Sequence, residues 1–409
     1  MEITITGVFA YITSYKLKKP VKLDFVGGVR TIIKRDALII KITTNSEIIG
    51  WGSGDTGEMG NRNWNIKDIL KVINVDLNKI LKGEDPSEIK ELWNKCSSLL
   101  DIREPLFSQI FGGIDIALWD IKGKIIGKPI CEILGRKRQY IDCYASAGMY
   151  QSIDNYINEA NELYNAGFRA YKMRPGTSPS KDIDIIKTIV EEFNDLKVLV
   201  DAHTWWRAAP KIYTNSTIFE LVRELDKLGL YWIEDPLHYE DHGSYLKLRQ
   251  ITETLISTGE NEQGPEDVKK LINKQLCDVI IVDVRLHGGI TKCLEIANLA
   301  NEFGIFYAAH NFSDMISQAA NAHIMLSVEK PSLFEYPTYT NNLWKGMYDN
   351  CLVTDLVNEE IRYHNGQISV TDNPGLGVEP IPNFESKYPY IEGSWTIWEN
   401  DKGELITKQ

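Results

Sequence analysis

The sequence predicts an α/β protein, with a (β/α)8 barrel flanked by a smaller α+β module. From about residue 141 onward, eight short apolar runs alternate with amphipathic segments at a nearly fixed interval. The residues before them read as strand hairpins followed by helices, without interleaving. At 409 residues the chain is too long for one compact domain. It fits a barrel of up to about 250 residues plus a second unit.

Residues 1–138 form the predicted N-terminal module. Three stretches within residues 1–65 alternate apolar with polar side chains at period two, and turn residues separate them, as in antiparallel hairpins. Residues 66–138 change to the spacing of amphipathic helices. Strands followed by helices are typical of an α+β unit, so we expect this module to fold apart from the barrel.

Residues 139–354 form the predicted barrel. Several of its helical segments end in a glycine, as helix C-termini do. The eight apolar runs are IDCYASAG, FRAYKMR, KVLVDAH, YWIEDP, LISTGE, VIIVDV, IFYAAH and LFEYP. Eight such repeats over about 200 residues predict a closed parallel barrel. Residues 355–409 again show strands and turns, and we expect them to return to the N-terminal module.

Composition excludes several classes of partner. With 45 basic and 57 acidic residues the formal net charge is −12, which disfavours binding of nucleic acid or an anionic membrane through bulk charge. The sequence has neither a run of 18 apolar residues nor the basic start and apolar core of a signal peptide. The six cysteines are scattered without a CxxC pair, as in proteins with reduced thiols. We therefore expect a cytoplasmic protein.

Three carboxylates close three successive apolar runs. Asp201, Glu234 and Glu260 follow one another at intervals of 33 and 26 residues. The C-terminal ends of barrel strands form the face on which barrel active sites lie. Three converging carboxylates repel one another unless a cation balances them, and all-oxygen ligands suit Mg²⁺. A helix cap or a loop acid explains any one of them, but less readily three in register, so we expect a magnesium site.

The next strand ends predict acid/base chemistry. Asp283 and His310 end the sixth and seventh runs, 27 residues apart. Adjacent strand ends bring the two side chains within hydrogen-bond reach, where the aspartate fixes the imidazole tautomer and raises its basicity. Glu335, in the eighth run, is a further inward carboxyl for substrate binding or charge stabilisation.

Two cations and a second histidine complete the candidate site. Lys172 and Arg174 alternate along the second run, so both point to one face of the strand. Inward cations among acids suggest an anionic substrate, and a structural salt bridge to the metal carboxylates is the alternative. His203 shares the face of Asp201 and is a candidate second proton-transfer group.

In this order the motifs resemble the enolase superfamily, in the mandelate racemase-like branch that contains the acid-sugar dehydratases. The resemblance covers essentially the whole chain. It rests on VDAH, IEDP, TGEN and LFEYP, on the Asp283/His310 pair, and on the flanking segments GGIDIALWDIKGKIIGKPICEILG and NPGLGVEP. It implies a capping domain over the barrel mouth, built from the N-terminal segment and the C-terminal tail. Its loops around Lys16–Arg30 and Gly52–Gly60 would then close over the substrate.

The resemblance also implies a reaction. Mg²⁺ chelates a substrate carboxylate, a base removes the α-proton and the metal stabilises the enediolate. Racemases of this branch carry a second lysine as base where this chain has Arg174, and arginine stays protonated. A two-base racemase is therefore disfavoured, although His203 could replace that lysine. The lactonising branch carries a lysine where this chain has Asp283, so that branch is disfavoured too.

Dehydration of a sugar acid remains. The triplet Asp-Ala-His at His203 matches aldonate dehydratases, in which one histidine abstracts the C2 proton and the other protonates the departing C3 hydroxyl. His310 is the favoured base because Asp283 supports it. The resemblance favours a pentonate or hexonate substrate, D-arabinonate first, and a homo-oligomer. The alternatives are a racemase or epimerase of a 2-hydroxy acid and a non-catalytic homologue that binds sugar acids.

Overall fold

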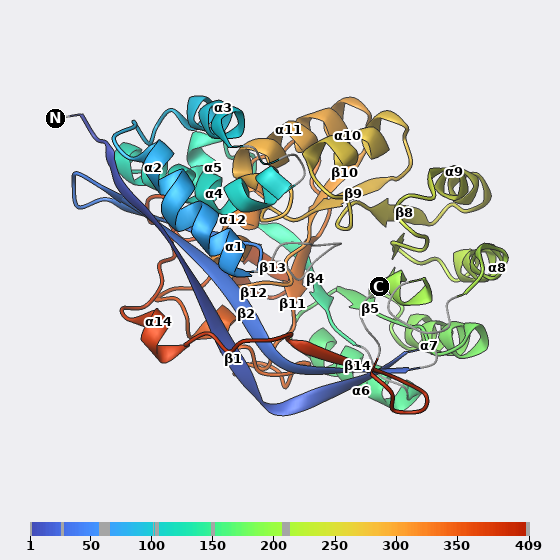
Figure 1. Cartoon of the computed structure of the whole chain (residues 1–409). Coiled ribbons are helices and arrows are strands. Elements are labelled where there is room, and N and C mark those ends of the chain that lie inside the picture. Colours follow the sequence, from blue (N-terminus) through green and yellow to red (C-terminus); the bar gives the residue numbers. More distant parts are fainter. Residues whose placement is uncertain are drawn as a thin grey trace.

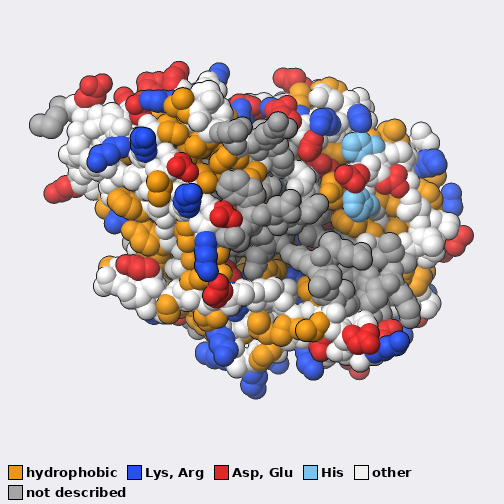
Figure 2. All heavy atoms as spheres, viewed as in Figure 1, with side chains coloured by type: hydrophobic (Ala, Val, Ile, Leu, Met, Phe, Trp, Pro, Cys, Tyr) orange, Lys and Arg blue, Asp and Glu red, His pale blue; other side chains and the backbone are white. Residues whose placement is uncertain are grey.

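The computed structural model describes residues 2–25, 28–56, 66–100, 102, 106–148, 152–206 and 213–405. An N-terminal antiparallel sheet with its helices lies beside a parallel barrel (Figure 1). Within the described residues, no helix combines the length and the hydropathy that crossing a membrane requires. On the face shown in Figure 2, acidic and basic side chains of the described residues are interspersed.

The N-terminal sheet is built on one long hairpin. β1 (Ile5–Phe25) pairs antiparallel with β2 (Gly28–Thr44) along almost its whole length. β3 (Ile49–Gly54) pairs with the half of β2 far from the hairpin tip. β14 (Thr396–Asn400), in the C-terminal tail, pairs with the half near the tip. The sheet is therefore completed by residues from both ends of the described chain.

Helices cover one side of this sheet. The helices of this part of the chain are α1 (Ile66–Lys71), the π-helical turn η1 (Val72–Leu77), α2 (Asn78–Leu81), α3 (Ile89–Leu99), α4 (Leu106–Ile126) and α5 (Ile130–Ile133), of which η1, α2 and α4 pack against the sheet strands. α4 is buried along most of its length because it packs between β3 and the barrel helix α11 (Gly289–Glu302). The approach to β3 requires glycine, since a Cβ atom at Gly52 would lie 1.9 Å from the carbonyl oxygen of Gly113.

The predicted barrel is confirmed. Its strands are β4 (Ile141–Ser146), β5 (Ala170–Met173), β6 (Lys197–Asp201), β7 (Trp232–Glu234), β8 (Leu255–Thr258), β9 (Val279–Val282), β10 (Phe306–Ala309) and β11 (Phe334–Pro337). β4 to β10 pair in parallel in chain order, and β11 closes onto β4. β10 meets the segment before β11 through a single bridge between Tyr307 and Pro331.

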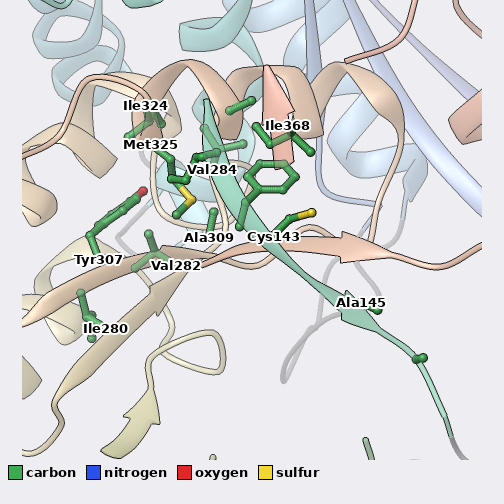
Figure 3. Close-up of a cluster of buried hydrophobic side chains, with 14 of the residues drawn as sticks. Cys143, Ala145, Ile280, Val282, Val284, Tyr307, Ala309, Ile324, Met325 and Ile368 are labelled. Atoms are coloured by element: carbon green, nitrogen blue, oxygen red, sulfur yellow. The ribbon is translucent and has the colours of Figure 1, made fainter. Parts of the chain in front are cut away.

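Helices connect the successive strands on the outside of the barrel. They are α6 (Ile153–Asn165), α7 (Pro179–Glu192), α8 (Asn215–Asp226), α9 (His242–Ile251), α10 (Pro265–Asn273), α11 and α12 (Met315–Met325). The short α13 (Cys351–Thr354) follows β11, and α14 (Phe384–Lys387) lies in the tail. Side chains alternate along the strands between an inner and an outer core. Figure 3 shows part of the outer core, which includes Ile280 and Val282 of β9 and Ile324 and Met325 of α12.

Two sequence expectations need correction. The described residues of Lys16–Arg30 are not a loop: residues 16–25 lie in β1 and residues 28–30 lie in β2, whose outer half also pairs with β14. The tail does not return wholly to the N-terminal sheet, since β12 (Arg362–His364) and β13 (Gln367–Ser369) form a hairpin that pairs with β4. Residues 57–60 of the expected second loop lie outside the described residues. The domain boundaries stay a prediction.

His323 joins three parts of the fold. It lies fully buried in α12, its Nδ1 accepts a hydrogen bond of 3.1 Å from the Cys131 amide of α5, and its Nε2 donates to the Leu376 carbonyl of the tail at 3.0 Å. Burial lowers the pKa of His323 to about 4, although the bond to Leu376 acts in the opposite direction.

We predict that His323 makes the protein less stable as the pH falls from 6.5 towards 4. In the unfolded chain the imidazole has its ordinary pKa of 6.5, so within this pH window it binds a proton there but stays neutral in the folded chain. The free energy of unfolding should fall by up to about 3 kcal/mol from this residue. Urea unfolding at several pH values tests this, and His323→Gln should flatten the slope. An equal slope in both proteins would contradict it.

Candidate active site

The three predicted metal carboxylates lie at neighbouring strand ends. Asp201 ends β6 and Glu234 ends β7, and the two residues are partners in the parallel register. Glu260 lies two residues beyond the end of β8. All three are buried. The strands that precede them are apolar and short, so each delivers its acid to the same end of the barrel.

Lys172 on β5 links these carboxylates to Glu335 on β11. Its Nζ lies 2.7 Å from Glu234 Oε1, 2.9 Å from Glu335 Oε1 and 3.5 Å from Asp201 Oδ2. Burial alone would lower the pKa of this ammonium, but Glu234 and Glu335 outweigh burial and hold the pKa well above its usual range. The carboxylates around Lys172 therefore favour its charged form.

Arg174 sits directly after β5 and is held from three sides. Its Nε lies 3.0 Å from Asp201 Oδ2, and its Nη1 donates to the Ala147 carbonyl at 2.6 Å. Its Nη2 donates to Ser146 Oγ at 2.9 Å, and that hydroxyl donates in turn to Glu335 Oε1 at 2.7 Å. Lys172 and Arg174 thus point inward as predicted from period two, and both make ion pairs with the site carboxylates.

Asp283 and His310 form the expected pair. Oδ2 of Asp283 lies 2.8 Å from His310 Nδ1, and His310 Nε2 lies 3.4 Å from Glu260 Oε2. Burial alone would lower the pKa of His310, but the charge of Glu260 and the bond to Asp283 raise the pKa above its ordinary value. The Asp283 bond leaves Nε2 as the ring nitrogen that faces the carboxylates.

Arg285 is a buried partner of this pair that the sequence reasoning missed. Its Nε and Nη2 lie 3.1 and 2.6 Å from the two oxygens of Asp283, and its amide donates to Oδ1 at 2.8 Å. Although burial acts in the opposite direction, Arg285 and His310 together hold the pKa of Asp283 well below its usual range. The signal was available, since Arg285 lies two residues after a strand-end acid.

His203 lies at the opposite end of the carboxylate series from His310. It begins the 3₁₀ turn η2 (His203–Trp205) after β6, and its Nδ1 lies 2.5 Å from Asp201 Oδ1. His310 contacts Glu260, so the two histidines touch the two outer carboxylates, and Glu234 comes between these in strand order. This arrangement gives the site two imidazoles at different strand ends.

Glu335 is an ionised acceptor in the barrel interior. Its Oε2 accepts from the Asn311 amide at 2.7 Å, and its Oε1 faces Lys172 and Ser146. Burial raises its pKa, but Lys172 outweighs burial and brings the pKa to about 2. Sequence reasoning placed Glu335 in the site but missed Ser146 and Asn311, because neither lies in a charged motif.

The donor set fits Mg²⁺ in its chemistry. Glu234 Oε2 is buried without a hydrogen-bond partner, so one carboxylate oxygen has free lone pairs. Burial, together with the charges of Asp201 and Glu260, raises the pKa of Glu234 well above its usual range despite Lys172. A divalent cation would offset this repulsion. In the described part of the chain, no three His, Cys, Asp or Glu side chains are already gathered closely enough to hold an ion.

We predict that Mg²⁺ stabilises the folded protein through Glu234. At about 100 times its dissociation constant, the ion should add roughly 3 kcal/mol to the free energy of unfolding. Thermal unfolding with increasing Mg²⁺ measures this, and Glu234→Gln should abolish most of the rise. Glu379→Gln, a change in an acid half-exposed in the tail, is the control. The same rise in the Glu234 variant would place the ion elsewhere.

Comparison with known proteins identifies the family. Residues 6–135 match the family described as "Mandelate racemase / muconate lactonizing enzyme, N-terminal domain", and residues 155–383 match "Enolase C-terminal domain-like". The chain belongs to the enolase superfamily. The two matches cover the N-terminal sheet with its helices and most of the barrel. The resemblance expected from the motifs is thereby confirmed.

Several named proteins are similar to this chain along most of its length. One, named arabinonate dehydratase, from Saccharolobus solfataricus, is 29% identical over 75% of this chain and 80% of its own length. Another, named D-xylonate dehydratase, from Haloferax volcanii, is 26% identical over 83% of this chain and 82% of its own. A solved structure of the 3,6-anhydro-D-galactonate cycloisomerase from Zobellia galactanivorans, 26% identical, superposes with a TM-score of 0.78 over 94% and 99% of the two chains.

Proposed function

We propose that this enolase-superfamily member is a Mg²⁺-dependent dehydratase of aldonate sugar acids, a carbon–oxygen lyase of the hydro-lyase class. Its product would be a 2-keto-3-deoxy acid. The observation that carries the proposal is the Asp283–His310 pair facing the same carboxylate series that His203 touches from the other end. Relatives named for arabinonate, xylonate and D-galactonate support a pentonate or hexonate substrate, with D-arabinonate as the first candidate.

Lys172 and Arg174 serve in binding rather than in proton abstraction. Both are buried cations whose pKa values lie above their ordinary range, because carboxylates surround them and outweigh the effect of burial. A group that cannot lose its proton cannot act as a base. In the racemases this strand carries a base, whereas in the proposed mechanism β5 would contribute positive charge that binds the substrate. They would hold oxygens of the anionic substrate, and their charges help to keep Asp201 and Glu335 ionised.

The two histidines divide the proton transfers. Neutral His310 donates its Nδ1 hydrogen to Asp283, so its Nε2 lone pair takes the proton from C2. His203 gives a proton to the C3 hydroxyl, the C3–O bond breaks and water leaves. The enol that remains tautomerises to the 2-keto acid. When bound, Mg²⁺ supplies positive charge for the substrate carboxylate, where negative charge develops as the C2 proton departs.

We predict that His310→Asn keeps the fold and Mg²⁺ binding but lowers turnover by at least about 100-fold. Loss of a general base typically costs this much, because no other group then lies at the C2 proton. Steady-state kinetics on the active sugar acid measures it, with thermal unfolding as the check on folding. His364→Asn changes an exposed histidine of β12 and serves as the matched control. Turnover near that of the control would remove His310 from the mechanism.

A screen of pentonates and hexonates tests the activity itself. With Mg²⁺ present, one or two sugar acids should yield a 2-keto-3-deoxy acid, and EDTA should abolish the product because the enediolate charge is then unbalanced. Deuterium entering C2 from solvent without loss of water would instead favour a racemase or epimerase. If neither product nor exchange appears, the non-catalytic alternative leads. Size-exclusion chromatography of the same sample tests the expected homo-oligomer.

A further inference from the structure

The segment that carries His310 is held by the N-terminal sheet as well as by the barrel. Residues 310–314 connect β10 to α12. From β3, Ser53 Oγ donates a 2.6 Å hydrogen bond to Asp314 Oδ2, and both side chains are buried. Asp314 is also the N-cap of α12, because its Oδ1 accepts from the amides of Ile316 and Ser317. The Asp314 carboxylate therefore caps the start of α12 and also accepts a hydrogen bond from β3 of the N-terminal sheet.

A second contact reaches the same segment from β2. Arg35 Nη2 donates to the Phe312 carbonyl at 2.9 Å. The Arg35 guanidinium lies 4.4 Å from the ring centre of Trp395, just before β14, and 5.9 Å from that of Phe312. The Phe312 ring stacks at 6.5 Å on His310 and lies 4.8 Å from the Arg174 guanidinium. Through Phe312, the contact with Arg35 is thus linked to His310 and Arg174 of the site.

The barrel supplies the remaining restraints on this segment. Asp283 holds the His310 ring, and Glu335 holds the Asn311 amide. These bonds hold the start of the segment, and Asn321 and Gln318 of α12 donate to the His310 and Ser313 carbonyls at 3.1 and 3.2 Å. Ser53 and Arg35 add bonds from the sheet at the middle and end of the segment. A short connection restrained at both ends has little freedom to rotate, so the direction of His310 Nε2 depends on both sets of contacts.

We infer that Ser53 and Arg35 are positioning residues for His310, so that the N-terminal sheet acts on the chemical step and not on substrate choice alone. The catalytic part of this inference rests on the proposed role of His310 as base. Removing the Ser53 hydroxyl leaves Asp314 Oδ1 to cap α12, so the helix persists while the tie to the sheet is lost. A reacting group misplaced by about 1 Å loses up to about 100-fold in rate.

Ser53→Ala and Arg35→Met test this, and Ser14→Ala is the matched control. Ser14 is also a buried serine of the N-terminal sheet, and its Oγ donates to Asp36 Oδ1 at 2.5 Å, within the sheet itself. Ser14 Oγ also accepts from the Ile391 amide of the tail at 2.9 Å, so both serine changes delete a bond to an aspartate, but only Ser53→Ala deletes a bond to the His310 segment. Arg35→Met retains the stem beside Trp395 and removes the donor.

We predict that kcat falls between about 10- and 100-fold in Ser53→Ala and Arg35→Met, with KM changed by less than about threefold. Hydrogen–deuterium exchange of the peptide spanning residues 310–317 should speed up in both variants. Ser14→Ala should match the wild type in kcat and in exchange of that peptide. Thermal unfolding shows that each variant is folded under the assay conditions.

Exchange and kinetics separate this inference from the proposed function. If no sugar acid is turned over, the proposed function fails, and the exchange of residues 310–317 still decides whether the sheet holds the segment. Unchanged exchange in Ser53→Ala overturns the positioning role. A rise in KM with kcat unchanged also overturns it, because the sheet would then act on binding alone. Equal losses in Ser53→Ala and Ser14→Ala would do the same.

Discussion

The buried ammonium of Lys172 is the interaction on which the rest of the site depends. Four carboxylates from β6, β7, β8 and β11 point into one end of the barrel, and such a group cannot stay ionised in a dry interior unless cations balance it. Lys172 bonds to Glu234 and Glu335, and Arg174 bonds to Asp201. The barrel can therefore form with these carboxylates inside it. The same charge balance keeps oxygen ligands available for a metal ion.

The two histidines of the site have different charged neighbours. His310 has two carboxylate neighbours, and one of them, Asp283, is itself held by Arg285. His203 has Asp201, which also faces Arg174 and Lys172. Similar imidazoles thus meet different balances of charge, and in the proposed mechanism this difference would let one site supply both a proton acceptor and a proton donor.

Much of the site could be predicted because the alternation of side chains along a strand shows which residues point to the same face. Alternation along β5 placed Lys172 and Arg174 on one face, and the ends of successive apolar runs placed Asp201 and Glu234 in register. Ser146 and Asn311 were missed because their roles arise from contacts with Glu335 on another strand, whereas the local contact of Arg285 with Asp283 could have been read from their spacing. The extent of the β1–β2 hairpin depends on β14, and the attachment of β13 to β4 depends on pairing between distant segments. Local patterns carry no information about such long-range partners.

The place of β14 in the sheet has a consequence for how the chain reaches this structure during synthesis. The outer half of β2 offers an edge of unpaired amides and carbonyls from the moment it leaves the ribosome, and its partner, residues 396–400, is made long afterwards. Open strand edges are sites of mispairing and aggregation. Arg30 lies on this edge, and a charged side chain on an open strand edge discourages such mispairing. The N-terminal sheet can therefore be completed only after residues 396–400 have been synthesised.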